Sequence, residues 1–388
     1  MTVAKHGIST VLPKLRFPEF RSELWNSKPL GEVAPLQRGF DLPSSDLQPG
    51  NVPVVYSNGV QSFHNTAIAN APGLMTGRSG TIGKLHFIEN GEYWPHNTSL
   101  WVTSFKGNVP KFVYFLFDFI GMRRFASGSG VPTLNRNDVH AFVIAVPESP
   151  AEQQKIVDCL TSLDEVIAAQ GRKVEALKAH KRGLMQQLFP REGETRPRLR
   201  FPEFRNAPEW QQKTLGRIAN VKASGDLDSS LFSETRSGGF LHPVYSNAVE
   251  RNGLYGHYSV PQYPRDSVTI TARGTLGVAF FRDHEFMGIG RLLVVSDLMD
   301  VHPRFLTECW NHLAVISNEV TSIPQLTAVT ARATKLPIPC IEEQLRIADC
   351  LSSLDTRITS ESNQLVALKT HKQGLMQQLF PAQEAAGA

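Results

Sequence analysis

The stretch from Glu152 to Pro190, EQQKIVDCLTSLDEVIAAQGRKVEALKAHKRGLMQQLFP, occurs twice in the chain of 388 residues. The second copy runs from Glu343 to Pro381 and reads EQLRIADCLSSLDTRITSESNQLVALKTHKQGLMQQLFP. At a constant offset of 191, 23 of the 39 positions are identical, without a gap. Each copy follows a stretch of about 140 residues, the size of an ordinary domain. The chain is therefore organised as globule, helix, globule and helix.

Each copy has the apolar spacing of a long amphipathic helix. Apolar side chains recur every three or four residues, which is the heptad pattern typical of a coiled coil. They are Ile156, Leu160, Leu163, Ile167, Val174, Leu177, Leu184 and Leu188 in the first copy, and Ile347, Leu351, Leu354, Ile358, Leu365, Leu368, Leu375 and Leu379 in the second. About 37 residues of helix would be roughly 55 Å long. Pro190 and Pro381 are expected to end the two helices.

The apolar stripe of each helix is narrow and needs a partner, and the other helix of the same chain can provide it. We expect the two helices to lie antiparallel around a pseudo-twofold axis. Polar residues interrupt the stripe at Gln170 and Lys181, and at the equivalent Glu361 and Lys372. Full overlap would place Gln170 opposite Glu361, where a polar contact would fix the register. The alternative is that each helix packs separately on its own globule.

The two globules share short stretches of sequence. Their lead-in segments are PKLRFPEFR at residues 13–21 and PRLRFPEFR at residues 197–205. The shorter matches are Tyr56-Ser57-Asn58 with Tyr245-Ser246-Asn247, residues 78–83 with 273–277, and residues 131–134 with 323–326. A repeat of this length indicates two copies of one domain and not a solenoid.

Runs of β-branched and aromatic residues bounded by Gly, Pro and Asn predict strands within each globule. The predicted strands are Val52–Tyr56, Leu85–Ile88, Ser99–Thr103, Val268–Ala272 and Leu292–Val295, and the predicted globule helices are Lys111–Phe125 and His302–Asn318. The fold class is therefore α+β: two globular α/β domains are separated by two long antiparallel helices that form a coiled coil. The predicted segments are residues 14–149, 150–190 (helix), 191–196 (linker), 197–339, 340–381 (helix) and 382–388 (disordered tail).

The composition is that of a globular protein, with 41% hydrophobic and 20% charged residues. A net charge of +4 permits a nucleic-acid partner without requiring one. There is neither a run of eighteen apolar residues nor a signal-like start, so we expect a cytoplasmic protein. The four cysteines form no CxxC pair, which argues against a zinc ribbon or thioredoxin chemistry.

The sequence shows no convincing catalytic or metal-binding constellation. The segment GRSGTIGKL at residues 77–85 resembles a phosphate-binding loop, but five residues separate its outer glycines and no Ser or Thr follows Lys84. A strand, not a helix, is expected after it, so a tight hairpin turn is the better interpretation. HExxH, GxSxG and the Asn/Asp-Pro-Pro-aromatic tetrapeptide of amino-methyltransferases are also absent. These absences favour a binding protein without catalytic residues or a metal.

Several of these motifs together resemble one known family, the specificity (S) subunit of type I restriction–modification systems. The matching stretches are the lead-in at residues 13–21, GRSGTIG at 77–83, SGSGVPTLNRNDV at 127–139 and EQQKIVDCLTSLDEVI at 152–167. The resemblance covers nearly the whole chain, and most of the stretches are duplicated.

The resemblance implies a non-catalytic, DNA-binding subunit with two target-recognition domains that each read half of a split double-stranded DNA site. It also implies two helical regions that set the spacing and bind two methyltransferase (M) subunits. The M subunits would use S-adenosylmethionine at adenine N6, and restriction (R) subunits would use ATP and Mg²⁺, so no cofactor is expected in this chain. Similar helices can dock one partner twice, whereas unlike globules can read two different half-sites.

Arg78 and Arg273 project from matching loops, where a guanidinium group suits a phosphate or a guanine edge. The predicted DNA-binding residues are Tyr56, Asn58, Arg78, Ser79, Thr81, Lys84, Asn97, Arg136, Tyr245, Asn247, Arg273, Thr275 and Arg291. The second loop is one residue shorter, and residues 322–326 lack the glycine–serine run of 127–130. Two alternatives are a stand-alone two-domain DNA-binding repressor and, less favoured, a nuclease or methyltransferase acting alone.

Overall fold

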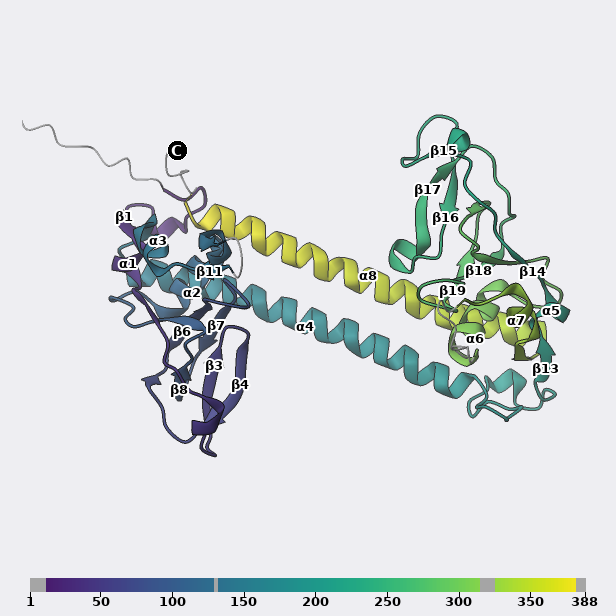
Figure 1. Cartoon of the computed structure of the whole chain (residues 1–388), viewed down its shortest axis with the longest axis horizontal. Coiled ribbons are helices and arrows are strands. Elements are labelled where there is room, and N and C mark those ends of the chain that lie inside the picture. The colour runs from purple at the N-terminus through teal and green to yellow at the C-terminus, as the bar shows by residue number, and fades with distance from the viewer. Residues whose placement is uncertain (1–11, 129–131, 315–324, 382–388) are drawn as a thin grey trace, which may run out of the picture. The chain divides into compact units, whose positions relative to one another are not determined.

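The computed structural model of the chain describes residues 12–128, 132–314 and 325–381. It divides into two compact units (Figure 1). Unit 1 comprises residues 1–171 and 363–388, and unit 2 comprises residues 172–362. Both boundaries fall inside the long helices, so each unit contains one globule and a segment of both helices.

The two predicted long helices are present with nearly the expected bounds. Helix α4 covers Pro150–Leu188 and helix α8 covers Ile341–Leu379, with 39 residues each. Each ends two residues before the proline that was expected to stop it. All sixteen residues of the predicted apolar stripes are buried or half-buried, which confirms the heptad interpretation.

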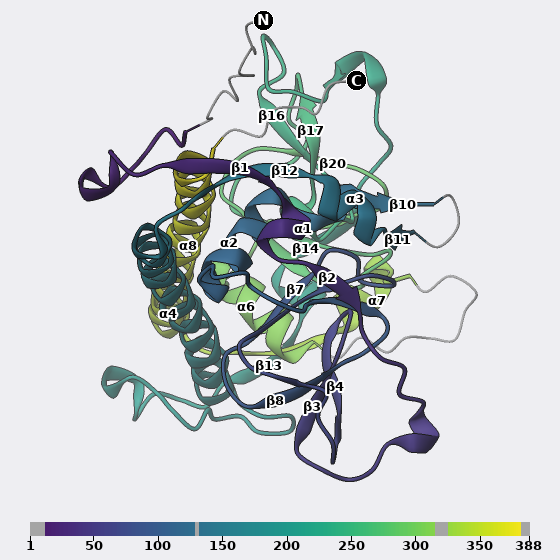
Figure 2. The same ribbon diagram turned by 90° about the vertical axis from the view of Figure 1, so that its left-hand side faces the viewer.

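Unit 1 is built from small, mostly antiparallel sheets covered by short helices. A pair of strands, β1 (Trp25–Pro29) and β12 (Val143–Pro147), closes the globule. The first four-stranded sheet has the order β2 (Leu36–Arg38), β9 (Ser99–Val102), β6 (Gly73–Gly77) and β7 (Leu85–Ile88). The second has the order β4 (Gly59–His64), β3 (Val52–Tyr56), β8 (Glu92–Pro95) and β5 (Ala69–Asn70). Strands β10 (Ala126–Ser127) and β11 (Thr133–Leu134) form a short pair, and the helices are α1 (Leu30–Val33), α2 (Pro110–Ile120) and α3 (Arg136–Ala141). Figure 2 shows the β3–β4–β8 sheet at one end of the unit and β1–β12 at the other.

Unit 2 repeats this plan. Its strand pair is β13 (Gln211–Thr214) with β22 (Lys335–Ile338). One sheet has the order β14 (Asn220–Ala223), β21 (Leu293–Ser296), β18 (Ser267–Ile270) and β19 (Ala279–Arg282). The other has the order β15 (Phe232–Ser233), β17 (Leu254–Tyr258), β16 (His242–Tyr245) and β20 (Met287–Gly288). The helices are α5 (Leu215–Ile218), α6 (Pro303–Leu313) and α7 (Ala328–Ala333). In both units the second sheet contains one parallel pair, β3–β8 and β16–β20, which confirms that the globules are copies of one domain.

The five predicted strands are present to within one or two residues at their ends, but one predicted helix is wrong. The stretch Lys111–Phe125 was expected to form a single helix, whereas α2 ends at Ile120. Gly121 adopts a left-handed conformation with φ 74° and ends the helix, and residues 122–125 form a separate 3-10 turn. Helix α6 ends at Leu313, and residues 315–318 of its predicted extension lie outside the described residues, as does the predicted tail 382–388.

The core of unit 1 contains the C-terminal end of α8. Met376, Leu379 and Phe380 are buried together with Ile156 and Leu160 of α4. The Phe380 ring lies 5.7 Å from the ring of Phe112 and 5.0 Å from that of Phe119, both in α2. Residues that are far apart in the sequence therefore close the first core.

The core of unit 2 contains the opposite ends of the two long helices. Leu188 and Phe189, at the end of α4, are buried with Ile347 and Leu351 near the start of α8. The Phe189 ring lies 5.7 Å from that of Phe305 in α6. Each core thus uses the start of one long helix and the end of the other. The alternative in which each helix packs separately on its own globule is therefore wrong.

Candidate nucleic-acid interface

Ion pairs join the two long helices within each unit. In unit 1, Lys372 Nζ lies 2.6 Å from Asp164 Oδ1. In unit 2, Lys181 Nζ lies 2.8 Å from Asp355 Oδ2. The two pairs are related by the offset of 191, so the lysines that interrupt the apolar stripes are paired across the helices. The predicted contact between Gln170 and Glu361 would join the two units and stays a prediction.

A second pair in unit 2 shows the direction of the helices. Lys173 Nζ lies 2.6 Å from Glu361 Oε1, and Lys181 pairs with Asp355. Because the position in α8 falls as the position in α4 rises, the helix segments of this unit run antiparallel. Burial opposes the charge of Lys181, but its hydrogen bond to Asp355 and its closeness to Glu308 outweigh this effect and raise its pKa.

Three loops of the unit 1 globule meet at Thr98. The Ser57 amide donates to Thr98 Oγ1 at 3.1 Å. The amides of Arg78 and Ser79 donate to the Thr98 carbonyl oxygen at 2.9 and 3.2 Å. Thr98 therefore holds the β3–β4 turn and the β6–β7 loop together, and we call this group the Thr98 hub. The hub brings the predicted residues Arg78 and Ser79 next to the Tyr56–Asn58 turn.

The β6–β7 loop closes a hairpin, as predicted, but residues 77–84 separate the paired residues Thr76 and Leu85, so it is wider than the tight turn expected. Gly80 and Gly83 have φ angles of 76° and 74°. The Gly83 amide donates to the Gly77 carbonyl at 3.0 Å, and strand β7 follows. Lys84 Nζ donates to the Asn58 carbonyl at 3.1 Å, which ties two predicted residues to each other. The loop is a hairpin and lacks the following helix that a phosphate-binding loop requires.

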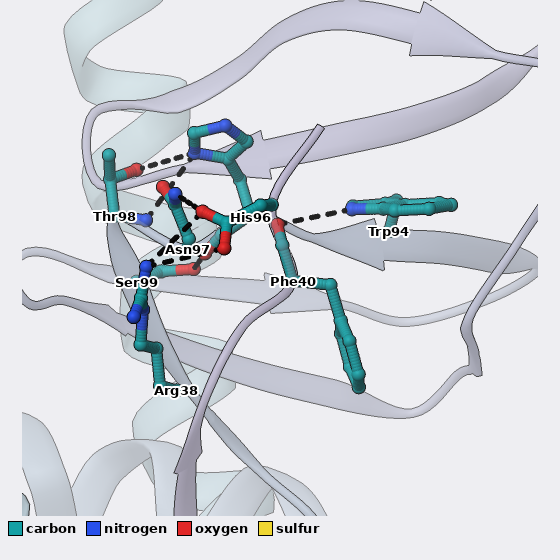
Figure 3. A network of polar contacts seen from close by, with 8 residues as sticks. Arg38, Phe40, Trp94, His96, Asn97, Thr98 and Ser99 are labelled. Atoms are coloured by element: carbon teal, nitrogen blue, oxygen red, sulfur yellow. Dashed lines mark hydrogen bonds and ion pairs between the residues drawn. The ribbon is translucent and has the colours of Figure 1, made fainter. Parts of the chain in front are cut away.

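Polar side chains surround Asn97 in the same region (Figure 3). Its amide donates to the carboxylate of Asp41, which also accepts from Arg38 Nη2 at 3.2 Å. The neighbouring His96 ring lies 4.0 Å from the Tyr56 ring, centroid to centroid, and its Nδ1 is 3.1 Å from Thr98 Oγ1. Burial lowers the pKa of His96. Tyr56, His96 and Asn97 therefore form one polar and aromatic surface beside the Thr98 hub.

Asn247 joins the corresponding loops in unit 2. Its Nδ2 donates to the Gly290 carbonyl at 2.7 Å, and its Oδ1 accepts from the Ala272 amide at 2.7 Å. The next residues along these two loops are Arg291 and Arg273, which are both exposed. We call this group the Asn247 hub. A side-chain amide here performs the connection that a threonine performs in unit 1.

The matching tripeptides Tyr56-Ser57-Asn58 and Tyr245-Ser246-Asn247 are not structurally equivalent. In the parallel pair of unit 1, Val55 is opposite Pro95, and the His96 amide donates to the Val55 carbonyl. In unit 2, Tyr245 is opposite Gly288, and the Ile289 amide donates to the Tyr245 carbonyl. The ladders therefore align Tyr245 with Val55, and the tripeptide is shifted by one residue.

This shift places Tyr245 in a buried cluster with Phe286, Leu292 and Val294. The Tyr245 side chain is 7% exposed, and its hydroxyl lies 2.9 Å from His284 Nε2. The prediction that its ring is available to DNA is therefore wrong in this structure. The tyrosine instead supports the surface from beneath.

Comparison with known sequences identifies the family. The sequence model of the type I restriction modification DNA specificity domain matches residues 22–179 and 208–370. The chain belongs to this family. The two matches cover most of the chain, one for each copy of the repeat.

Specificity subunits from two other organisms are similar to this chain. A putative type I specificity subunit of Mycoplasma pneumoniae is 24% identical over 224 residues, which cover 58% of each chain. The MjaVIII type I restriction enzyme specificity subunit of Methanocaldococcus jannaschii is 21% identical over 280 residues, 65% of this chain and 64% of that one. The matched region thus spans less than two thirds of the length of these relatives.

Two solved structures from type I restriction–modification systems share the fold. The type I restriction–modification S subunit of M. genitalium aligns with a TM-score of 0.66 at 16% identity, over 96% of this chain and 100% of that chain. A chain from a structure on assembly and conformational transition of a type I restriction–modification system aligns with a TM-score of 0.56 at 18% identity, over 93% and 98%. These likenesses support the α+β fold class predicted above.

Most predicted DNA-binding residues of this specificity-domain protein lie at its surface. Asn58, Thr81, Lys84, Arg136, Arg273, Thr275 and Arg291 are exposed, and Tyr56, Arg78, Ser79, Asn97 and Asn247 are half-buried. The Leu134 amide donates to the Arg78 carbonyl at 2.9 Å, which brings the segment before Arg136 to the same loop. In unit 2 the Leu326 amide bonds Ala272 in the same way, at 3.0 Å.

Two residues organise these surfaces in roles that were not predicted. Thr98 acts partly through its backbone carbonyl, for which the sequence carries no signal. Arg282 ends the apolar run Ala279–Arg282 and is 3% exposed, with its guanidinium carbon 3.5 Å from the centroid of the Tyr245 ring. Burial lowers the pKa of Arg282 to about 10, so it keeps its charge at neutral pH. The sequence feature that could have indicated the role of Arg282 is its place at the end of a short apolar strand.

Neither a metal site nor a membrane-spanning helix is found in residues 12–128, 132–314 and 325–381. No group of three or more His, Cys, Asp or Glu side chains there could hold a metal ion. No helix in this part of the chain is long and apolar enough to cross a membrane.

Proposed function

We propose that this chain is the non-catalytic specificity subunit of a type I restriction–modification complex and binds an asymmetric, bipartite DNA site. One observation carries the proposal: the two units share a fold and paired helices, but their loop surfaces are built differently. The Thr98 hub and the Asn247 hub present different side chains from equivalent loops. Two unlike surfaces on one repeated scaffold suit two different half-sites.

The exposed and half-buried groups around the hubs have the chemistry that DNA requires. Arg78, Lys84 and Arg136 in unit 1, and Arg273 and Arg291 in unit 2, offer donors for phosphates or for guanine edges. Tyr56 and Asn97 add an aromatic face and an amide. Binding through phosphate contacts makes the affinity fall steeply with salt concentration.

The two repeated helices suit two copies of one partner. We propose that α4 and α8 dock two methyltransferase subunits, and that restriction subunits join the complex through them. S-adenosylmethionine, ATP and Mg²⁺ then serve the partner subunits, which methylate adenine N6 or cleave DNA. The role of this chain is to select the site and to set the distance between its halves.

Sequencing of methylated DNA tests the proposal directly. The chain is co-expressed with a type I methyltransferase subunit in a host that lacks adenine methylation, and N6-methyladenine is mapped by single-molecule sequencing. We expect one split, asymmetric motif that disappears when this chain is omitted. Methylation that does not depend on this chain would contradict the proposal. Full sequence-specific binding by the chain alone, in a mobility-shift assay, would indicate a stand-alone repressor.

A further inference from the structure

The turn between β16 and β17 is longer than its counterpart in unit 1. In unit 1, Tyr56 pairs with Gly59, so only residues 57–58 lie between the strands. In unit 2, the Ser246 amide donates to the Gly253 carbonyl at 2.9 Å, and residues 247–252 lie between them. The added residues include Arg251, which unit 1 lacks at this place.

The backbone of this turn is in an unfavourable conformation. Arg251 has φ 51° and ψ 31°, and Asn252 has φ 55° and ψ 30°. Asparagine tolerates the left-handed region, but a long side chain such as that of Arg251 seldom adopts it and stays there only where its surroundings enforce it. Gly253, with φ 80°, follows at a point where a Cβ atom would lie 2.9 Å from the Ser246 carbonyl oxygen. Such strain in a surface turn is typical of a functional site.

Two side chains hold the turn at its ends. Arg282 Nη2 donates to the Asn252 carbonyl at 2.9 Å, and Arg282 Nε donates to Thr269 Oγ1 at 3.0 Å. The buried Arg282 is itself stacked on Tyr245, as described above. At the start of the turn, the Asn247 hub fixes the chain to two neighbouring loops. The turn is therefore anchored to the sheet through a buried guanidinium and a side-chain amide.

The Arg251 side chain is exposed. Within the described part of the chain it makes no hydrogen bond or ion pair, so its guanidinium is available to a ligand. It stands on the turn that begins at Asn247, and Asn247 also holds the loops that carry Arg273 and Arg291. The hub thus connects three segments that each carry an exposed arginine.

We propose that Arg251 reads a guanine in the half-site bound by unit 2, with Arg282 and Asn247 as positioning residues that do not touch DNA. This inference rests on the proposed function. A guanidinium group matches the O6 and N7 acceptors of guanine in the major groove and depends on orientation to do so. A phosphate contact needs no such fixed backbone, because flexible side chains satisfy it equally well. The strained, doubly anchored turn therefore favours base reading.

The test uses the complete complex with its methyltransferase subunits and compares methylation motifs. Arg251→Ala is expected to relax one guanine position in one half-site, by roughly 10- to 100-fold in preference, and to leave the other half-site unchanged. The matched control is Arg217→Ala, an exposed arginine on α5, which should leave the whole motif unchanged.

A second variant tests the positioning role. Arg282→Lys keeps the charge but loses the forked donors that hold Asn252 and Thr269 together. It should relax the same guanine position as Arg251→Ala, and the double variant should relax it no further. This shared base position is a readout that general destabilisation would not produce.

Three results would overturn the inference. An unchanged motif for Arg251→Ala would show that the residue does not read DNA. Weaker methylation at every site with an unchanged motif and a smaller salt dependence would show a phosphate contact only. A wild-type complex that directs no split motif would overturn the proposed function, and this inference with it.

Discussion

Lys372 in unit 1 and Lys181 in unit 2 occupy the same position in the two helix copies, but only part of their surroundings is shared. Each lysine pairs with the equivalent aspartate of the other helix. Lys372 Nζ then lies 5.1 Å from the centroid of the Phe115 ring, whereas Lys181 Nζ lies 3.0 Å from Glu308 Oε1. The helix-to-helix contact is kept while the helix-to-globule contact differs. The pair of long helices is therefore the shared part of the repeat, and the globule side chains that pack on these helices are the part that varies.

The largest loss of stability confined to one unit should come from substitutions at the C-terminal ends of α4 and α8. Phe380→Ala should remove about 3–5 kcal/mol from unit 1, because its ring is fully buried among the α2 phenylalanines. Phe189→Ala should do the same to unit 2. Hydrogen exchange resolved by peptide measures each effect. Equal loss of protection in both globules for either variant would show that the cores are not separate.

Replacing Lys181 should lower the free energy of unfolding more than replacing Lys372. Lys181→Met leaves the Glu308 carboxylate, 19% exposed, without its cation, and should cost roughly 1–3 kcal/mol. Lys372→Met should cost less than about 1 kcal/mol, because Asp164 is 40% exposed and the new side chain still packs on Phe115. Urea unfolding of the two variants compares them. Equal losses would mean that Glu308 does not distinguish the units.

Substitutions in the two hubs should cost less stability, and the two costs should differ. Asn247→Ala leaves the Ala272 amide and the Gly290 carbonyl without their partner, which should cost about 1–2 kcal/mol. Thr98→Val removes the hydroxyl that accepts from Ser57 but keeps the carbonyl that holds Arg78 and Ser79, so about 1 kcal/mol is expected. Thermal unfolding and the methylation motif are the measurements. Each variant should affect only its own half-site, and a change in both half-sites would contradict the division into two readers.

Acidification should have the smallest effect, and it should reach both units. Burial lowers the pKa of His86, His96 and His140 in unit 1 and of His302 and His312 in unit 2. A histidine with a depressed folded-state pKa is neutral when folded and takes up a proton on unfolding. Stability is therefore complete above about pH 6.5 and falls as the pH drops below that value.

His140 allows this effect to be isolated. Its Nε2 accepts from the Leu36 amide at 2.8 Å, which requires the unprotonated ring. His140→Gln should flatten part of the loss of stability below about pH 6.5, measured by denaturant unfolding. His180→Gln, on an exposed position of α4, is the control. An unchanged pH profile for His140→Gln would show that protonation of this ring is not linked to folding.

The sequence predicted the frame of the molecule better than its surfaces. Heptad spacing and two prolines were enough for α4 and α8, because a long amphipathic helix depends on local spacing. The burial of Tyr245 was not predicted, because the spacing before the two tyrosines differs. One residue lies between Pro243 and Tyr245, whereas two residues lie between Pro53 and Tyr56. A shift of one residue moves a side chain to the other face of a strand. The motif match concealed this shift.

Other features could not be read from residue types. Thr98 holds the Arg78 loop through a carbonyl that any residue possesses, and the role of Arg282 depends on a turn that is far from it in sequence. Gly121 was a recognisable helix end, but it is followed by Met122, Arg123 and Arg124, which favour helix, and these suggested a longer helix. Local pattern thus located the elements, and the contacts between loops needed the fold.

The closure of the first core by Phe380 has a consequence for the order in which the protein is made. Unit 2 lies within the sequence of unit 1, as a continuous insertion between residues 171 and 363. The first globule is synthesised early, but its core is incomplete until residues 376–380 exist. At translation rates of 5–20 residues per second, this wait is roughly 10 to 50 s. The domain that is translated first is therefore the one that is completed last.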